Sequence, residues 1–215
     1  MARVIASHQT QAYAAKVMRK GGDRWNGAWF YSEEILRGIV PAVRTERPWV
    51  LVNYFGMCED HAIVFAHNNW HPHIYEWLEA YDDLVIVVCR QSTADALAHL
   101  GRTVVLPLSV DVAQVASHAR PKDRDVCFAG RMEKLKADLG VPKLTGVPRE
   151  RFLDELARYR RVYAIDRTAI EAKVLGCEVL PYDPEFPDPS VWEVLDTSDA
   201  ARMLQEALDA IDGQG

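Results

Sequence analysis

RVYAIDRTAIEAKVLGCEVLPYD, residues 161–183, contains two short apolar runs separated by a stretch of helix-forming residues. The apolar runs, residues 161–165 and 177–182, are of the kind that forms buried strands. Residues 169–175 favour a helix, and Gly176 follows at the point where a helix would end. Strand, helix and strand in this order predict a right-handed βαβ unit.

The turn between the first strand and the helix is polar. Asp166, Arg167 and Thr168 interrupt the apolar run just before Ala169. Backbone N–H groups at a helix N-terminus have no partner within the helix, so this turn predicts a phosphate site. Glu171 is one turn further into the helix, where its side chain would lie near a ligand that enters over the helix start.

The same alternation extends over both halves of the chain and predicts an α/β fold with parallel sheets. Further strands are expected at residues 3–7, 49–55, 62–67, 84–89, 103–108 and 125–129, and further helices at 10–20, 32–43, 72–81, 93–100, 149–159 and 198–211. The sequence becomes polar between residues 109 and 125. We therefore expect two Rossmann-like domains, residues 1–112 and 113–215, whose sheets face each other across a cleft.

Composition limits the function classes. The 215 residues suffice for one large or two small domains, and the formal net charge of −6 disfavours nonspecific nucleic-acid binding. No apolar run approaches the roughly 20 residues of a membrane span, and residues 1–11 lack the apolar core of a secretory signal. The cysteines form no C-x-x-C pair, which indicates reduced thiols and a cytoplasmic protein. They are Cys58, Cys89, Cys127 and Cys177.

Ligands of open α/β sheets bind where strands end, so the residues after each predicted strand are candidates. Gly130 follows the strand at 125–129 directly and would let a ligand approach the backbone closely. Arg131 supplies a forked donor for phosphate oxygens, and Lys134 or Lys136 supplies a second charge. Together with the helix start at Thr168, these residues predict a diphosphate site.

Four segments of the C-terminal half resemble, in order, segments of the donor-binding half of GT-B glycosyltransferases of the retaining family 4 type. The segments are LPLSVDV (106–112), FAGRMEKLK (128–136), TGVPRERFLDELARYRRVYAI (145–165) and RTAIEAKVLGCEVLPYD (167–183). This resemblance implies a small GT-B-like fold and a metal-independent transfer of sugar from a nucleotide-sugar donor, with no cofactor. It also implies a transfer in which the donor phosphate deprotonates the acceptor.

The resemblance assigns roles to individual residues. It implies that Arg131 and Lys136 bind the donor diphosphate and that Glu171 accepts hydrogen bonds from the ribose hydroxyls. Backbone N–H groups at residues 167–169 would help to hold the phosphates. The family usually has a sugar-contacting glutamate eight residues before the ribose-binding one. Tyr163 occupies that position here, and Asp166 is the nearest acid that could substitute.

Strand ends of the N-terminal half offer further candidates. His67 ends the strand at 62–67, and several GT-B transferases have a histidine beside the donor sugar after a comparable strand. An imidazole there would hydrogen-bond the sugar or stabilise the leaving diphosphate. Asn68 and Asn69 would bind sugar hydroxyls, and His8 follows the first strand.

The same region allows a metal hypothesis. His61, His67, His71 and His73 lie within a short stretch and could bind zinc if a loop folded around the ion. There is, however, no helical His-x-x-x-His pattern with an acidic partner. We therefore interpret the sequence as lacking a metal site.

Three functions stay open on this fold. The first is a transferase, the second a nucleotide or nucleotide-sugar binding protein without transferase activity, and the third a nucleotide-sugar hydrolase or epimerase. The acceptor of a transferase could be a small molecule, a protein or a modified DNA base, since the chain also resembles in style small transferase-like proteins of phages and mobile elements. The sequence leaves open whether the chain is a monomer or a homodimer.

Overall fold

The computed structural model describes residues 3–6, 34–47, 49–52, 58, 60–66, 72–130, 135 and 138–213. The chain divides into two compact units, each with a parallel sheet, and this confirms the predicted α/β class. Unit 1 comprises residues 1–15, 28–108 and 197–215, and unit 2 comprises residues 16–27 and 109–196. The chain thus enters unit 2 at Ser109, close to the expected boundary at Val112. It re-enters unit 1 at Thr197, whereas we expected residues 113–215 to form one domain.

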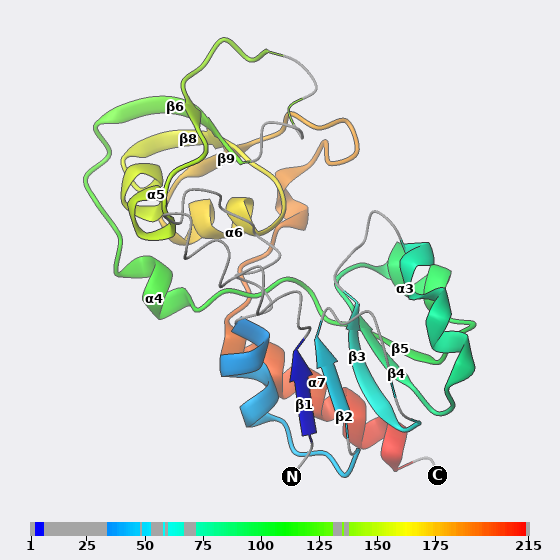
Figure 1. The fold of residues 1–215 in the computed structure, drawn as a ribbon. Coiled ribbons are helices and arrows are strands. Elements are labelled where there is room, and N and C mark those ends of the chain that lie inside the picture. The colour runs from blue at the N-terminus through cyan, green and yellow to red at the C-terminus, as the bar shows by residue number, and fades with distance from the viewer. Residues whose placement is uncertain are drawn as a thin grey trace. The chain divides into compact units, whose positions relative to one another are not determined.

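The sheet of unit 1 has five parallel strands in the order β1-β2-β3-β4-β5 (Figure 1). They are β1 (Arg3–Ala6), β2 (Trp49–Val52), β3 (Ala62–Ala66), β4 (Val85–Val88) and β5 (Arg102–Val105). Every residue of β3 and β4 is buried, so these central strands are covered on both faces. This burial explains their uninterrupted apolar sequence, which is typical of parallel sheets.

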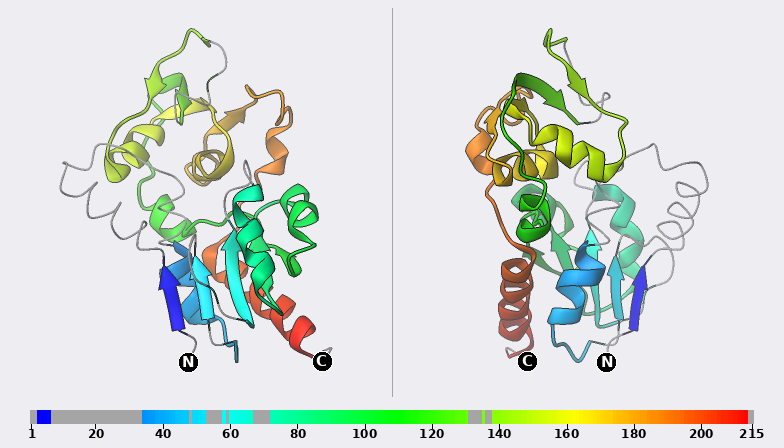
Figure 2. Two further views of the ribbon diagram at one scale, coloured as in Figure 1. Left: turned by 45° about the vertical axis from the view of Figure 1, so that its right-hand side comes forward. Right: turned by 90° about the vertical axis from the view of Figure 1, so that its left-hand side faces the viewer.

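Helices cover the described part of this sheet. On one face, η3 (Pro72–Ala80) and α3 (Gln91–Leu97) share an apolar cluster with alternate residues of the strands, Val64 and Ile86 among them. The predicted helix at 72–81 is a 3₁₀-helix rather than an α-helix. The amphipathic helix α7 (Thr197–Asp212) lies along the sheet beside η1 (Ile35–Ile39) (Figure 2).

Pro41 interrupts the helix that the sequence predicts at 32–43. Its described part consists of the π-helix η1 followed by the 3₁₀-helix η2 (Val40–Ala42). A proline lacks the N–H that an α-helix would need at this position, so the predicted break is confirmed.

The sheet of unit 2 has the order β7-β6-β8-β9, also parallel. Its strands are β6 (Arg124–Ala129), β7 (Lys143–Leu144), β8 (Tyr159–Tyr163) and β9 (Glu178–Leu180), and its helices include α4 (Val112–Ala116), α5 (Arg149–Leu156) and α6 (Asp166–Val174). The predicted βαβ unit is therefore present as β8, α6 and β9. Gly176, with φ +73°, follows α6 in the left-handed conformation that ends helices.

The side of the sheet on which successive strands are added changes after β7, on either side of β6. β7 follows β6 on one side, whereas β8 and then β9 are added on the other side. Both crossovers to β8 and β9 run in the same direction, so right-handed connections place α5 and α6 on the same face of the sheet. Ligands of such sheets bind at the carboxyl ends of the strands where this reversal occurs, here β6 and β8.

Among the described residues, no helix combines the length and the apolar character that a bilayer crossing requires.

Candidate functional site

The carboxyl ends of β6 and β8 form the candidate site of unit 2. Phe128 of β6 is paired with Tyr163 of β8, so the residues that follow, Gly130 and Ile165, leave the sheet side by side. Both strand exits have an unusual backbone conformation with positive φ. Gly130 has φ +148°, and Asp166, directly after Ile165, has φ +55°. A non-glycine residue in the left-handed region costs free energy and is concentrated at ligand sites.

Gly130 is needed for the path of the chain. At φ +148° any residue with a side chain is strained, and a Cβ added there would touch the Phe128 ring at 3.5 Å. The Gly130 N–H donates to the Leu144 carbonyl of β7 at 3.4 Å. The glycine therefore keeps its backbone uncovered by a side chain at the point where β6 ends.

The first turn of α6 begins beside Gly130. Its N-cap, Ile165, makes no side-chain capping hydrogen bond, so the helix start carries the partial positive charge of its N–H groups without a capping oxygen from that residue. Asp166 is half-buried, whereas Arg167, Thr168 and Ala169 are buried. Four of the predicted site residues thus lie in one helical turn next to Gly130.

Glu171 lies beneath this turn and is completely buried. Arg149, the first residue of α5, binds both carboxylate oxygens, with Nη1 at 2.7 Å from Oε2 and Nη2 at 2.5 Å from Oε1. Arg167 adds a third hydrogen bond from Nε to Oε1 at 2.6 Å. Since two arginines already hold the carboxylate, the predicted contact of Glu171 with a ribose stays a prediction.

The charge of Glu171 is stabilised in place. Burial opposes ionisation of this carboxyl, but the positive charges and hydrogen bonds of Arg149 and Arg167 outweigh burial and hold the pKa of Glu171 below its ordinary value. Tyr182, which follows β9, has its pKa shifted in the opposite direction. Burial, together with the charges of Asp183 and Asp166, raises the pKa of Tyr182, so its hydroxyl stays protonated at neutral pH.

The other predicted site residues fall outside the described part of the chain. They are His8, His67, Asn68, Asn69, Arg131, Lys134 and Lys136. Arg149, by contrast, belongs to the site but was not among the candidates. It lies 22 positions before Glu171, and the hydrogen bonds that join the two side chains reveal its place beside that residue.

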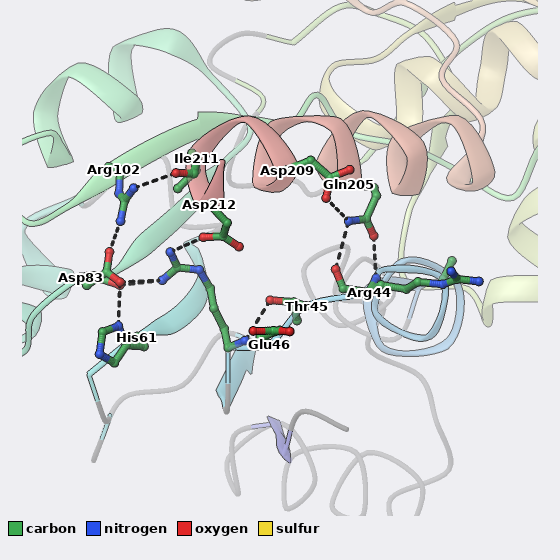
Figure 3. Close-up of a pocket in the computed structure, with 12 residues that line it drawn as sticks. Arg44, Thr45, Glu46, His61, Asp83, Arg102, Gln205, Asp209, Ile211 and Asp212 are labelled. Atoms are coloured by element: carbon green, nitrogen blue, oxygen red, sulfur yellow. Dashed lines mark hydrogen bonds and ion pairs between the residues drawn. The ribbon is translucent and has the colours of Figure 1, made fainter. Parts of the chain in front are cut away.

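A polar cavity of about 1030 Å³ lies at the amino ends of the unit 1 strands (Figure 3). Asp83 is its central acid. It accepts hydrogen bonds from His61, at 2.6 Å from Nδ1, and from Arg102, and it is paired with the buried Arg47 at 3.5 Å. The hydrogen bond from His61 is the largest of the effects that lower the pKa of Asp83 to about 2.

The cavity residues also anchor the last two turns of α7. Arg47 donates to Asp212 at 2.8 Å, and Arg102 donates to the Ile211 carbonyl at 3.2 Å. The Gln205 amide bonds both the backbone N–H and the carbonyl of Arg44. This network explains why α7 packs on unit 1. It also accounts for His61, which pairs with an aspartate here.

No metal centre is apparent in the part of the chain that the structure describes, where no three His, Cys, Asp or Glu side chains are placed to hold an ion. Comparisons with protein-family models, with curated proteins and with solved structures found no significant match.

Proposed function

We propose that this protein is a cytoplasmic, metal-independent glycosyltransferase that binds the nucleotide diphosphate of a sugar donor at the carboxyl ends of β6 and β8. The observation that carries the proposal is the pair of strained strand exits at Gly130 and Asp166, which flank the reversal point of the unit 2 sheet. Nucleotide-binding α/β folds hold their nucleotide at such a point. The resemblance of residues 106–183 to the donor half of family 4 transferases supports the same ligand.

Different residues of the chain would bind the diphosphate, neutralise its charge and contact the sugar. Backbone N–H groups in the first turn of α6 would donate hydrogen bonds to the diphosphate, and Gly130, whose own N–H is bonded to Leu144, would leave room for it. Arg131 and Lys136 would neutralise its charge as the sugar leaves, and His67 would contact the sugar. The donor phosphate would take the proton of the acceptor, so no catalytic base is required from the protein.

A thermal-shift series with UDP, GDP, ADP, dTDP and their sugars tests the binding step. A ligand at 100 times its Kd stabilises the folded state by about 2.7 kcal/mol. For a chain of this length that raises the melting temperature by roughly 5–10 °C. If no member of the series raises the melting temperature, the proposal is wrong. Consumption of the responding nucleotide sugar then tests transfer.

Glycine variants test the location. Gly130→Ala is expected to abolish the thermal shift, because the added Cβ strains the exit of β6. Gly140→Ala is the matched control, since Gly140 also has positive φ (+63°) but precedes β7 and has no atom within 4 Å of an added Cβ. An equal shift in wild type and Gly130→Ala would place the ligand elsewhere.

A second function is a nucleotide-binding protein without transferase activity. Two observations favour it. Tyr163 stands where the family has a sugar-contacting glutamate, and the Glu171 carboxylate is enclosed by two arginines. Binding of a nucleotide sugar without its consumption, in the presence of candidate acceptors and in their absence, would select this function.

A further inference from the structure

A lysine and a cysteine of unit 2 are in direct contact. The Nζ of Lys122 donates a hydrogen bond to the Sγ of Cys177 at 3.0 Å, and Cys177 is only 7% exposed. Of the three lysines that the structure describes, Lys143 pairs with Asp138, and Lys173 donates to two carbonyl oxygens. Lys122 contacts sulfur instead, and no carboxylate of the described residues pairs with it. An amine and a thiol, which can both act as nucleophiles, thus lie side by side.

The backbone on both sides of this contact is held in place. Lys122 precedes β6, and its carbonyl accepts a hydrogen bond from Arg160 of β8 at 3.4 Å. Cys177 precedes β9, and its N–H donates to the Ala172 carbonyl at 2.8 Å, directly after the left-handed turn at Gly176. Because these strands are parallel, both residues lie at their amino ends, at the opposite end of the sheet from the candidate nucleotide site. The two side chains meet without any change in the fold, which favours a reaction between them.

The surroundings of the thiol determine which reagents reach it. Burial raises the pKa of Cys177, whereas the hydrogen bond and the positive charge of Lys122 act against this rise. Cys127, the neighbouring thiol in the core, has no exposed surface, and burial raises its pKa to about 12. A small oxidant such as hydrogen peroxide is therefore expected to react slowly with Cys177, but before Cys127.

We propose that Lys122 and Cys177 form a covalent nitrogen–sulfur bridge when a hydroperoxide oxidises the thiol, which makes the pair a redox-dependent modification site. In the first step, the Cys177 sulfur attacks one peroxide oxygen, the O–O bond breaks, and the products are a sulfenic acid and water. In the second step, the Lys122 amine, which has lost its extra proton to solvent, attacks the sulfur. The N–S bond forms, the S–O bond breaks, and the hydroxyl leaves as water with one amine proton. The sulfur loses two electrons in total, and the peroxide gains them.

The bridge would connect residues that are 55 positions apart in the chain. The enclosed segment contains β6, α5, β8 and α6. A cross-link over such a span stabilises the folded state because it restricts the unfolded chain. Oxidation is therefore expected to raise the melting temperature by roughly 8–16 °C, and reduction with dithiothreitol should reverse the change.

Peptide mapping of the full chain after treatment with excess hydrogen peroxide at pH 8 tests the proposal, with the remaining thiols blocked by iodoacetamide in urea before digestion. The expected product is a linked peptide that joins Lys122 to Cys177, is about 2 Da lighter than the sum of its two parts, and is cleaved by dithiothreitol. Lys122→Arg and Cys177→Ser should give no linked peptide. The matched control Cys127→Ser should give as much as wild type. Circular dichroism of each variant confirms that it is folded.

Two results would overturn the proposal. A disulfide between Cys127 and Cys177 also removes about 2 Da, but it would disappear in Cys127→Ser and persist in Lys122→Arg. Recovery of Cys177 from wild type as a free thiol or a sulfinic acid, without a linked peptide, would show that the contact does not lead to a bond. Neither result involves the nucleotide site, so failure of the bridge would leave the proposed function intact.

Discussion

Replacing Arg149 with leucine is expected to destabilise unit 2 by about 3–5 kcal/mol, the usual cost of breaking a buried ion pair. The change removes two of the three hydrogen bonds to Glu171 and leaves a carboxylate with no exposed surface held by Arg167 alone. For a chain of this length, the loss corresponds to roughly 6–20 °C in melting temperature.

Urea denaturation monitored by circular dichroism measures this loss, and Arg158→Leu provides the control. Arg158 binds Asp123 with distances of 3.0 and 2.6 Å, but the two side chains are 35% and 53% exposed. An exposed pair is worth about 0–1 kcal/mol, so the control should lose little. The comparison separates the effect of burial from that of pairing.

The pH dependence supplies a second check. Because the folded-state pKa of Glu171 is below its ordinary value of 4.5, its pairing stabilises the protein fully above that value. The stabilisation disappears as the pH falls through the lower, folded-state pKa. The difference between wild type and Arg149→Leu should therefore shrink in acid. A loss below about 1 kcal/mol at pH 7 would refute the reasoning that this pair is buried and strongly coupled.

Four further outcomes are expected. Gly130→Ala should lose about 1–3 kcal/mol in urea denaturation, because φ is +148° there; wild-type stability would contradict the strained exit. Asp166→Gly should keep or gain stability by up to about 1 kcal/mol, since glycine accepts φ +55° freely, and a clear loss would show that the side chain itself stabilises the turn. The paired Asp83 carboxylate stabilises wild type fully above pH 3.8, and this stabilisation is lost as the pH falls toward 2. Asp83→Asn should lack it, so acid-denaturation curves identical to those of wild type would exclude a stabilising network around Asp83. Cys127, buried and with its pKa raised by burial to about 12, should resist iodoacetamide at pH 8 in the native state and react in urea; rapid native labelling would contradict its position in the core.

Much of the fold was predictable because its strands are short apolar runs bounded by clear breaks. The unit formed by β8, α6 and β9 follows from the pattern of residues 161–183. Strand β8 ends at Tyr163 rather than at the predicted Ile165, because Ala164 and Ile165 lead from the sheet into the left-handed turn at Asp166. Apolar character marked Ala164 and Ile165 as buried, which they are, but did not show that they leave the sheet.

Other elements gave no signal in the sequence. The strand β7 has only two residues, Lys143 and Leu144, which is too short for a hydrophobic period. The apolar face of α7 shows that the helix packs against a partner, but Leu204 and Leu208 do not specify which one. Polar contacts from Arg47 and Arg102 to the end of α7 identify unit 1 as that partner.

Some features of the candidate site were likewise predictable from the sequence, whereas others were not. Gly130 and the turn at residues 166–169 could be proposed from the sequence because glycine and helix-start residues follow strands in a recognisable order. The pairing of Glu171 with Arg149 could not be derived from the sequence, since the two residues are 22 positions apart. Side-chain partners across two helices depend on packing, which local patterns do not encode.

A crystal structure of the protein with the nucleoside diphosphate that gives the largest thermal shift tests the central claim most directly. The account predicts phosphate oxygens within hydrogen-bonding distance, about 2.7–3.2 Å, of backbone N–H groups in the first turn of α6, next to Gly130. A nucleotide bound only at the amino ends of the strands, or only in the cavity beside Asp83, would contradict it.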